Sequence, residues 1–317
     1  MQLPDSFITT IRNTFKEDGE KFLAVLPFLI QETSQRWRLT DVQPVPNLSY
    51  NFVAFAKQKP SSTGRGQGEG DVILKVGVPN RELTSEISAL KLFNGDGACQ
   101  LLESDVERGL LLLERLKPRI MLAELEDDDE RTIIAAEVMQ KIWRTPPNEN
   151  NFIRLSDWFD GLKKIRPHFN GGTGPFPKAI LERVESFLPE LLADKNVKLI
   201  HGDFHYFNIL SSERGWLAID PKGVIGPAGY EVGPLMLNPW NSLSDRINFQ
   251  RRAKRRVGIL SERLGLSRES IIKWAMAHAI LSAWWSIEDN EDEKYSLECA
   301  KIFSEMKYLL YRGLSPR

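Results

Sequence analysis

Residues 201–210 read HGDFHYFNIL and lie between the apolar run 197–200 (VKLI) and residues 211–220 (SSERGWLAID). Asp203 precedes Asn208 by five positions, and Asp220 ends an apolar run that follows a hairpin-like turn. Carboxylate and amide oxygens are hard ligands of the kind that Mg²⁺ takes. A carboxylate beside them can orient a hydroxyl group and accept its proton. The stretch therefore predicts a loop in which Asp203 is a general base while Asn208 and Asp220 hold a metal ion.

An upstream lysine and glutamate complete the pattern of a phosphoryl-transfer enzyme. Lys75 lies near the end of the apolar run 72–76, and Glu86 follows eleven residues later on a helix predicted over residues 81–93. In kinases a strand lysine contacts the α- and β-phosphates of the nucleotide, and a helix glutamate holds it in place. Glu82 is the competing partner of Lys75. Glu86 is favoured because Glu82 lies where the helix begins.

The order of secondary structure predicts an α+β protein with two unequal lobes. A chain of 317 residues is long for a single core. We expect an N-terminal lobe over residues 1–115, rich in strands, and a helical lobe over residues 116–317, with residues 114–118 as the connection. Strand-like runs occur at residues 37–39, 50–56, 71–76, 99–102 and 109–113, and the later helical patterns at 129–144, 155–166, 177–194, 246–264, 268–289 and 292–312.

Composition excludes several classes of protein. The net charge of −1 is unlike that of a general nucleic-acid binder, which needs a positive surplus. Two cysteines, Cys99 and Cys299, are too few for a disulfide scaffold. The early apolar stretch 22–30 is interrupted by Pro27 and is too short to span a membrane. We expect a cytoplasmic protein without a nucleic-acid, membrane or obligatory protein partner.

Beyond these features, the chain resembles a known family, the aminoglycoside phosphotransferases. It is most similar to the branch of streptomycin 6-phosphotransferases and hydroxyurea-resistance kinases, over about residues 47–289. The resemblance implies a protein-kinase-like fold, ATP and Mg²⁺ as cofactors, and phosphorylation of a hydroxyl group on a small molecule. The motifs that carry it are residues 72–79 (VILKVGVP), 111–116 (LLLERL), 201–203 (HGD) with Asn208, 218–226 (AIDPKGVIG), 229–233 (GYEVG) with 238–239 (NP), and 283–289 (AWWSIED).

The resemblance also implies residue roles. It agrees with Asp203 as the base, with Asn208 and Asp220 as metal ligands, and with Lys75 on the phosphates. The segment containing Glu114 and Leu116 would edge the adenine pocket. The chain departs from the family pattern at residues 204–207 (FHYF), which are bulkier than the Leu-His-Pro-Gly of many relatives, and at residues 226–229 (GPAG), which lack an acidic residue.

Two segments compete for the donor phosphates. Residues 46–51 (PNLSYN) are favoured, because Ser49 and nearby backbone N–H groups could reach them. Residues 64–70 (GRGQGEG) are rich in glycine but directly precede the lysine strand, which is the wrong context for a phosphate cradle.

Candidate acceptor residues lie on the late helix and in the catalytic loop. A cationic acceptor would be bound by carboxylates beside an aromatic surface, which points to Trp285, Glu288 and Asp289. Core packing explains one of the adjacent tryptophans, Trp284 or Trp285, equally well. His205 either contacts the substrate or fills space, whereas His201 is expected to support the loop.

Three other functions fit parts of the same pattern. A metabolic kinase for a sugar, choline or homoserine would use the same fold. A pseudokinase scaffold would keep nucleotide binding without turnover, and the complete catalytic set argues against it. A zinc hydrolase would use His201, Asp203 and His205, but no second ligand cluster accompanies them.

Overall fold

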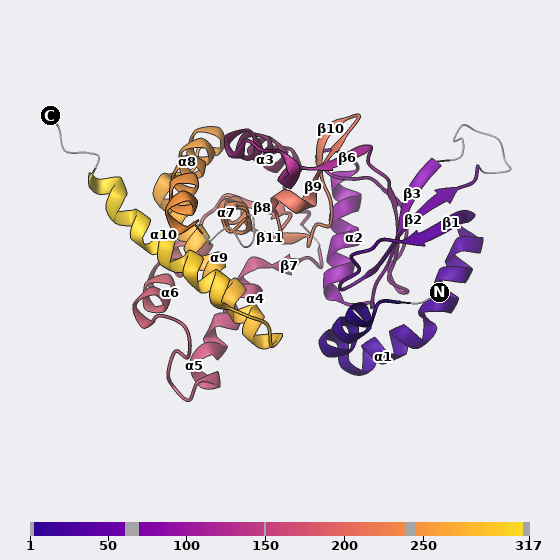
Figure 1. Cartoon of the computed structure of the whole chain (residues 1–317), viewed down its shortest axis with the longest axis horizontal. Helices are drawn as coiled ribbons and strands as arrows, with labels where there is room; N and C mark the ends of the chain where they lie inside the picture. The colour runs from indigo at the N-terminus through magenta and orange to yellow at the C-terminus, as the bar shows by residue number, and fades with distance from the viewer. Residues whose placement is uncertain (1–2, 61–69, 149, 239–244, 313–317) are drawn as a thin grey trace. The chain divides into compact units, whose positions relative to one another are not determined.

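The computed structural model describes residues 3–60, 70–148, 150–238 and 245–312, with side chains up to residue 306 (Figure 1). The chain divides into two compact units, Met1–Lys117 and Pro118–Arg317. The sequence placed the end of the first lobe at residue 115. The glycine-rich segment proposed as an alternative phosphate cradle lies, apart from Gly70, outside the described residues.

The first unit contains one antiparallel sheet of five strands, in the order β1-β2-β3-β5-β4. Lys75 lies on the central strand β3, where it is paired with Val53 of β2 and Leu111 of β5. The lysine is therefore fixed by neighbours on both sides. The strands are β1 (Leu39–Pro44), β2 (Phe52–Gln58), β3 (Gly70–Val76), β4 (Leu101–Asp105) and β5 (Leu110–Glu114).

Helix α2 (Arg81–Phe93) has the bounds that the sequence predicted. The side chain of Asn80 accepts a hydrogen bond from the backbone N–H of Leu83, which caps the first turn. Asn94 ends the helix in the left-handed conformation, with φ 48°. These caps fix which residues face the sheet, and Glu86 is among the buried ones.

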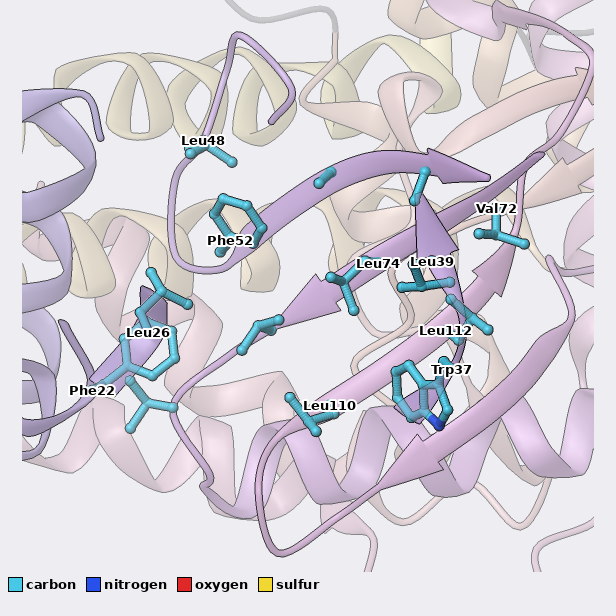
Figure 2. Close-up of a cluster of buried hydrophobic side chains, with 14 of the residues drawn as sticks. Phe22, Leu26, Trp37, Leu39, Leu48, Phe52, Val72, Leu74, Leu110 and Leu112 are labelled. Atoms are coloured by element: carbon cyan, nitrogen blue, oxygen red, sulfur yellow. The ribbon is translucent and has the colours of Figure 1, made fainter. Parts of the chain in front are cut away.

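Helix α1 (Asp5–Arg36) consists of two helical segments that meet at a kink at Lys16, and its apolar side chains pack on the sheet. Figure 2 shows Phe22 and Leu26 of α1 near Phe52 and Leu74 of the strands, in a cluster that excludes water. The predicted strand at residues 37–39 overlaps β1 only at Leu39. Trp37 is the C-cap of α1, where its backbone N–H bonds to the carbonyl of Thr33, and the strand begins after the turn at Trp37 and Arg38.

The second unit is mainly helical and carries two small sheets, ordered β10-β9-β6 and β7-β11-β8. Helix α9 (Arg268–Glu288) is its core element, since it packs against α6, α7, α8 and α10 (Figure 1). Five predicted helices are confirmed with small shifts at their ends: α3 (Asp128–Ile142), α6 (Lys178–Leu192), α8 (Arg246–Leu264), α9 and α10 (Lys294–Arg312). The strands are β6 (Pro118–Met121), β7 (Ile153–Arg154), β8 (Val197–Ile200), β9 (Ile209–Ser212), β10 (Gly215–Ala218) and β11 (Val224–Pro227).

The predicted helix over residues 155–166 is wrong as a single element. It is divided into α4 (Leu155–Asp160), a 3₁₀ turn (Gly161–Lys164) and α5 (Ile165–His168), because Gly161 ends α4 and Pro167 follows soon after. The short α7 (Val232–Met236) was not predicted. Among the described residues, no helix is long and apolar enough to cross a membrane.

Candidate active site

The loop between β8 and β9 brings three of the predicted site residues together. The Asn208 Nδ2 donates a hydrogen bond to the carbonyl of Asp203 at 3.0 Å, which closes the loop on itself. The His205 Nε2 lies 3.6 Å from the Asp203 Oδ1 and 3.2 Å from the Asn208 Nδ2. The Asp203 side chain remains 42% exposed, so its carboxylate can meet a substrate.

Asp220 is held beside this loop by the backbone. The N–H of Ile219 donates to the carbonyl of Asn208 at 2.9 Å, which ties the end of β10 to the loop. Asp220 itself has φ 62°, in the left-handed region that few residues other than glycine adopt. A strained residue of this kind persists only where its surroundings fix it, which is common at functional sites.

His201 is completely buried and stabilises the loop through hydrogen bonds. Its Nε2 is 2.8 Å from the carbonyl of Ile219, and its Nδ1 accepts from the N–H of Asp203 at 3.2 Å. Burial lowers the pKa of His201 to about 4, against the raising effect of the Asp203 charge. The imidazole is therefore neutral, and both of its nitrogens are engaged in hydrogen bonds.

Glu231 is a buried carboxyl group that the sequence reasoning missed. It ends the 3₁₀ turn Ala228–Glu231, and its two oxygens accept the backbone N–H groups of His201 at 2.7 Å and Gly202 at 2.9 Å. Burial raises the pKa of Glu231 to about 8, although the two N–H groups act to lower it. A glutamate inside the otherwise apolar and small residues 224–237 was the available signal in the sequence.

The electrostatic surroundings keep Asp203 ionised. Burial alone would raise the pKa of Asp203, but electrostatic interactions with His205 and Lys222 outweigh it, and the pKa lies below its ordinary value. A carboxylate at neutral pH is the form that can accept a proton from a hydroxyl group.

In the first unit, the structure pairs Lys75 with Glu86. The Lys75 Nζ lies 2.7 Å from the Glu86 Oε1 and 2.8 Å from the Glu86 Oε2, so the contact is bidentate. The side chains are 4% and 8% exposed, respectively. The competing Glu82 is exposed on the same helix.

Comparison with known families identifies this arrangement. Residues 41–290 match the model of the aminoglycoside/hydroxyurea antibiotic resistance kinase family. The chain belongs to this family. Like its relatives, it is a phosphotransferase that acts on small molecules.

Curated relatives cover most of the chain. It is 28% identical to the streptomycin 6-kinase of Streptomyces glaucescens over 91% of this chain and 92% of the relative. It is also 28% identical to the hydroxyurea phosphotransferase of Kitasatospora aureofaciens, over 86% of this chain and 76% of the relative. The streptomycin 3''-kinase of Klebsiella pneumoniae is 30% identical over 70% of this chain and 82% of the relative.

Solved structures show the same fold. The choline kinase LicA from Streptococcus pneumoniae superposes with a TM-score of 0.58 at 17% identity, covering 89% of this chain and 98% of that one. A thermostable mutant of aminoglycoside phosphotransferase APH(4)-Ia, in a ternary complex with ADP and hygromycin B, gives 0.57 at 13% identity over 86% and 97%. The protein-kinase-like fold, with a β-rich N-terminal lobe and a helical C-terminal lobe, is thus confirmed.

The donor atoms in the loop suit the metal of a kinase of this family. The Nδ2 of Asn208 is used within the loop, and its Oδ1 has no protein partner among the described residues. One amide oxygen and the exposed carboxylate of Asp220 match Mg²⁺, which is usually bound through one or two protein ligands, substrate phosphates and water. A zinc site fits poorly, because in the part of the chain that the structure describes no three His, Cys, Asp or Glu side chains converge.

The remaining candidates for nucleotide binding are placed as follows. Glu114 ends β5, and its Oε1 accepts the backbone N–H of Gln100 at 2.8 Å. Leu116 is buried just beyond the strand. Ser49 is exposed between β1 and β2. Their roles in the family's nucleotide site stay predictions.

The acceptor candidates on α9 are only partly brought together. Trp285 is half-buried and meets Trp158 edge to face, with ring centroids 5.3 Å apart, whereas Trp284 is buried in the core. Glu288 is ion-paired with Lys164 at 2.9 Å. Asp289 is exposed at the end of α9, where its N–H bonds to the carbonyl of Trp285. Sequence reasoning missed Trp158, which lies far from α9 in the chain.

The buried histidines make the fold sensitive to acid. His278 on α9 is, like His201, buried, and burial lowers its pKa from 6.5 to about 4. The unfolded chain takes up a proton at each histidine below pH 6.5 and the folded chain does not, so stability falls as the pH drops from 6.5 towards 4. The expected loss is about 3 kcal/mol per histidine. Urea unfolding from pH 7 to 4.5 should show a shallower loss for His278→Asn than for the wild type, and equal slopes would contradict this account.

Glu231 has the opposite pH dependence. Its pKa is about 8 in the folded chain and 4.5 in the unfolded one, so stability falls as the pH rises through this window, by up to about 1.4 kcal/mol per pH unit. Towards pH 8, His201 and His278 are neutral in both the folded and the unfolded chain and add little to the slope. Glu231→Gln, which cannot ionise, should flatten the slope of unfolding free energy in this range. An unchanged slope in urea unfolding would show that Glu231 is already ionised at pH 6.5.

Proposed function

We propose that this protein transfers the γ-phosphoryl group of ATP to a hydroxyl group of an aminoglycoside such as streptomycin. The observation that carries the proposal is the loop in which an ionised, accessible Asp203 lies beside Asn208 and Asp220. The names of the relatives support the acceptor, since two of them are streptomycin kinases that act at different positions of that molecule.

Each residue has a defined role in the proposed reaction. Asp203 orients the acceptor hydroxyl and accepts its proton as the oxygen attacks the γ-phosphorus in line. Mg²⁺ bound to Asn208 and Asp220 would neutralise negative charge on the donor phosphates. Lys75, held by Glu86, binds the α- and β-phosphates.

The other residues position the two substrates. Glu114 and Leu116 edge the adenine, and Ser49 reaches the phosphates. On the acceptor side, Trp285 offers an aromatic face, and His205, Glu288 and Asp289 offer polar contacts. Glu288 would have to exchange its ion pair with Lys164 for a contact with the acceptor.

A coupled ADP-release assay tests the proposal. Purified protein with ATP and Mg²⁺ is offered streptomycin, hydroxyurea, choline and homoserine one at a time, and phosphorylated product is identified by mass spectrometry. Release of ADP and phosphorylated streptomycin are expected. Turnover of choline or homoserine without turnover of streptomycin would instead assign a metabolic kinase, and no turnover of any compound would overturn the proposal.

A further inference from the structure

An aromatic wall formed by the rings of Trp158 and Trp285 lies directly beside the catalytic loop. Gly202 has φ +89°, and a Cβ atom at this position would lie only 3.0 Å from the Trp158 Cη2. Trp158 therefore packs on the backbone next to Asp203. Its ring meets Trp285 edge to face, and both tryptophans are half-buried, so each keeps a part of its surface in contact with solvent.

His278 continues this wall from α9. Its ring centroid lies 6.2 Å from that of Trp285 and 5.6 Å from that of Tyr230. Tyr230 in turn meets Trp158 edge to face, with ring centroids 6.2 Å apart, and its neighbour Glu231 accepts the backbone N–H of Gly202, so the imidazole lies beside the catalytic loop. Three elements thus converge here: the catalytic loop, α9 and the turn that carries Tyr230.

The tautomer of His278 follows from its partner. The hydroxyl group of Tyr230 lies 2.9 Å from the His278 Nδ1. Burial raises the pKa of Tyr230 well above its ordinary value, so the hydroxyl keeps its proton. His278 is itself neutral, with a pKa of about 4. Because Nδ1 is the one hydrogen-bond partner of the buried hydroxyl among the described residues, we assign the hydroxyl as the donor to Nδ1, which puts the hydrogen of the imidazole on Nε2.

The Nε2–H group of His278 donates no hydrogen bond within the part of the chain that the structure describes. Although the residue is only 6% exposed, Nε2 has no hydrogen-bond acceptor among the described residues, and it is not one of the polar atoms sealed from solvent. A neutral donor left open beside a catalytic carboxylate is suited to a substrate oxygen.

Close backbone packing holds the imidazole in place. A Cβ atom at Gly233 would lie 2.7 Å from the His278 Cβ, so α7 packs directly on α9 at this residue. The Tyr230 hydroxyl then fixes the ring orientation. The donor is consequently preorganised, and a ligand need not order it on binding.

We propose that His278 determines acceptor specificity. Its Nε2–H group donates a hydrogen bond to a second oxygen of the acceptor. This oxygen lies beside the hydroxyl group that Asp203 holds and against the wall formed by Trp158 and Trp285. The inference rests on the proposed function and adds to it the kind of acceptor that is preferred. Such an acceptor carries an oxygen next to the reacting hydroxyl, as in a polyhydroxylated ring. His278 takes up and releases no proton in the reaction.

Two amide substitutions separate this role from a structural one. In His278→Asn, the Oδ1 can occupy the place of Nδ1 and accept from Tyr230, but no donor reaches the place of Nε2. In His278→Gln, the longer side chain places an amide N–H group near the position that Nε2 has in the wild type.

The measurement is steady-state kinetics with streptomycin and ATP-Mg²⁺. We expect His278→Asn to raise the KM for streptomycin by about threefold to tenfold, the worth of one neutral hydrogen bond. The KM for ATP should be unchanged, and His278→Gln should stay within about twofold of the wild type in the KM for streptomycin.

The decisive comparison is between the KM values for streptomycin of His278→Asn and His278→Gln. If His278 is purely structural, His278→Asn, which keeps the Tyr230 hydrogen bond, should be tolerated better than His278→Gln. This result would overturn the inference. Equal KM values in Asn and wild type would do the same. Failure of the proposed function is seen separately, in the wild type: if it does not phosphorylate streptomycin, both proposals fall before any variant is compared.

Discussion

The Asp203→Asn variant is expected to lose about 10²- to 10⁴-fold in kcat for phosphoryl transfer, the usual contribution of a general base. The amide has nearly the shape of the carboxylate, so the loop closed by Asn208 should persist. It cannot, however, accept the proton of the acceptor hydroxyl. Because the loss is confined to the chemical step, the affinity for ATP should stay close to that of the wild type. ADP release and equilibrium nucleotide binding measure the two effects.

A matched variant controls for the loss of a charge. Asp160→Asn removes a carboxylate from α4 of the same unit, where it is 63% exposed and paired with Lys163. It should retain wild-type kcat. A kcat for Asp203→Asn within threefold of that of Asp160→Asn would remove Asp203 from the role of base.

The parts of the site that the sequence predicted are those that lie close together in the chain. Asp203, His205 and Asn208 belong to one loop, so their spacing alone places them near one another. Lys75 and Glu86 lie on adjacent elements, and helical periodicity with the Asn80 cap fixes the face on which Glu86 is found. Local physical rules suffice for such residues.

The missed residues depend on contacts between distant segments. Glu231 bonds to backbone groups 29 and 30 residues away in the chain, and the Tyr230 hydroxyl meets a histidine 48 residues away. No periodicity connects such positions. The same holds for Glu288, whose pairing with Lys164 spans 124 residues, so its carboxylate was assigned to the acceptor without regard to a competing partner.

Element boundaries failed where tertiary packing overrides a short pattern. Residues 37–39 (WRL) alternate between apolar and polar as a strand does, but Trp37 is buried in the cluster that α1 forms with the sheet. It caps the end of α1 there, and the chain turns at Trp37 and Arg38 before β1 begins. A pattern of three residues carries too little information to distinguish a helix end from a strand.

Variants of the Lys75–Glu86 pair should affect the stability and the activity of the protein differently. Removing one partner leaves the other charge buried without compensation, so Glu86→Leu should lower the free energy of unfolding by about 3–5 kcal/mol. Replacing both residues by apolar ones removes the burial penalty as well as the attraction. The double variant Lys75→Met with Glu86→Leu should therefore recover most of the stability, as measured by urea unfolding followed by circular dichroism.

Activity should not recover with stability. The double variant has no ammonium group on β3 to bind the donor phosphates, and we expect ADP release from it to be as low as from Glu86→Leu. Glu82→Leu is the matched control, since Glu82 lies one turn earlier on α2 and is exposed; it should be close to the wild type in both measurements. If the stable double variant still transferred phosphate at the wild-type rate, Lys75 would be a structural residue and the donor phosphates would have to be bound by other groups.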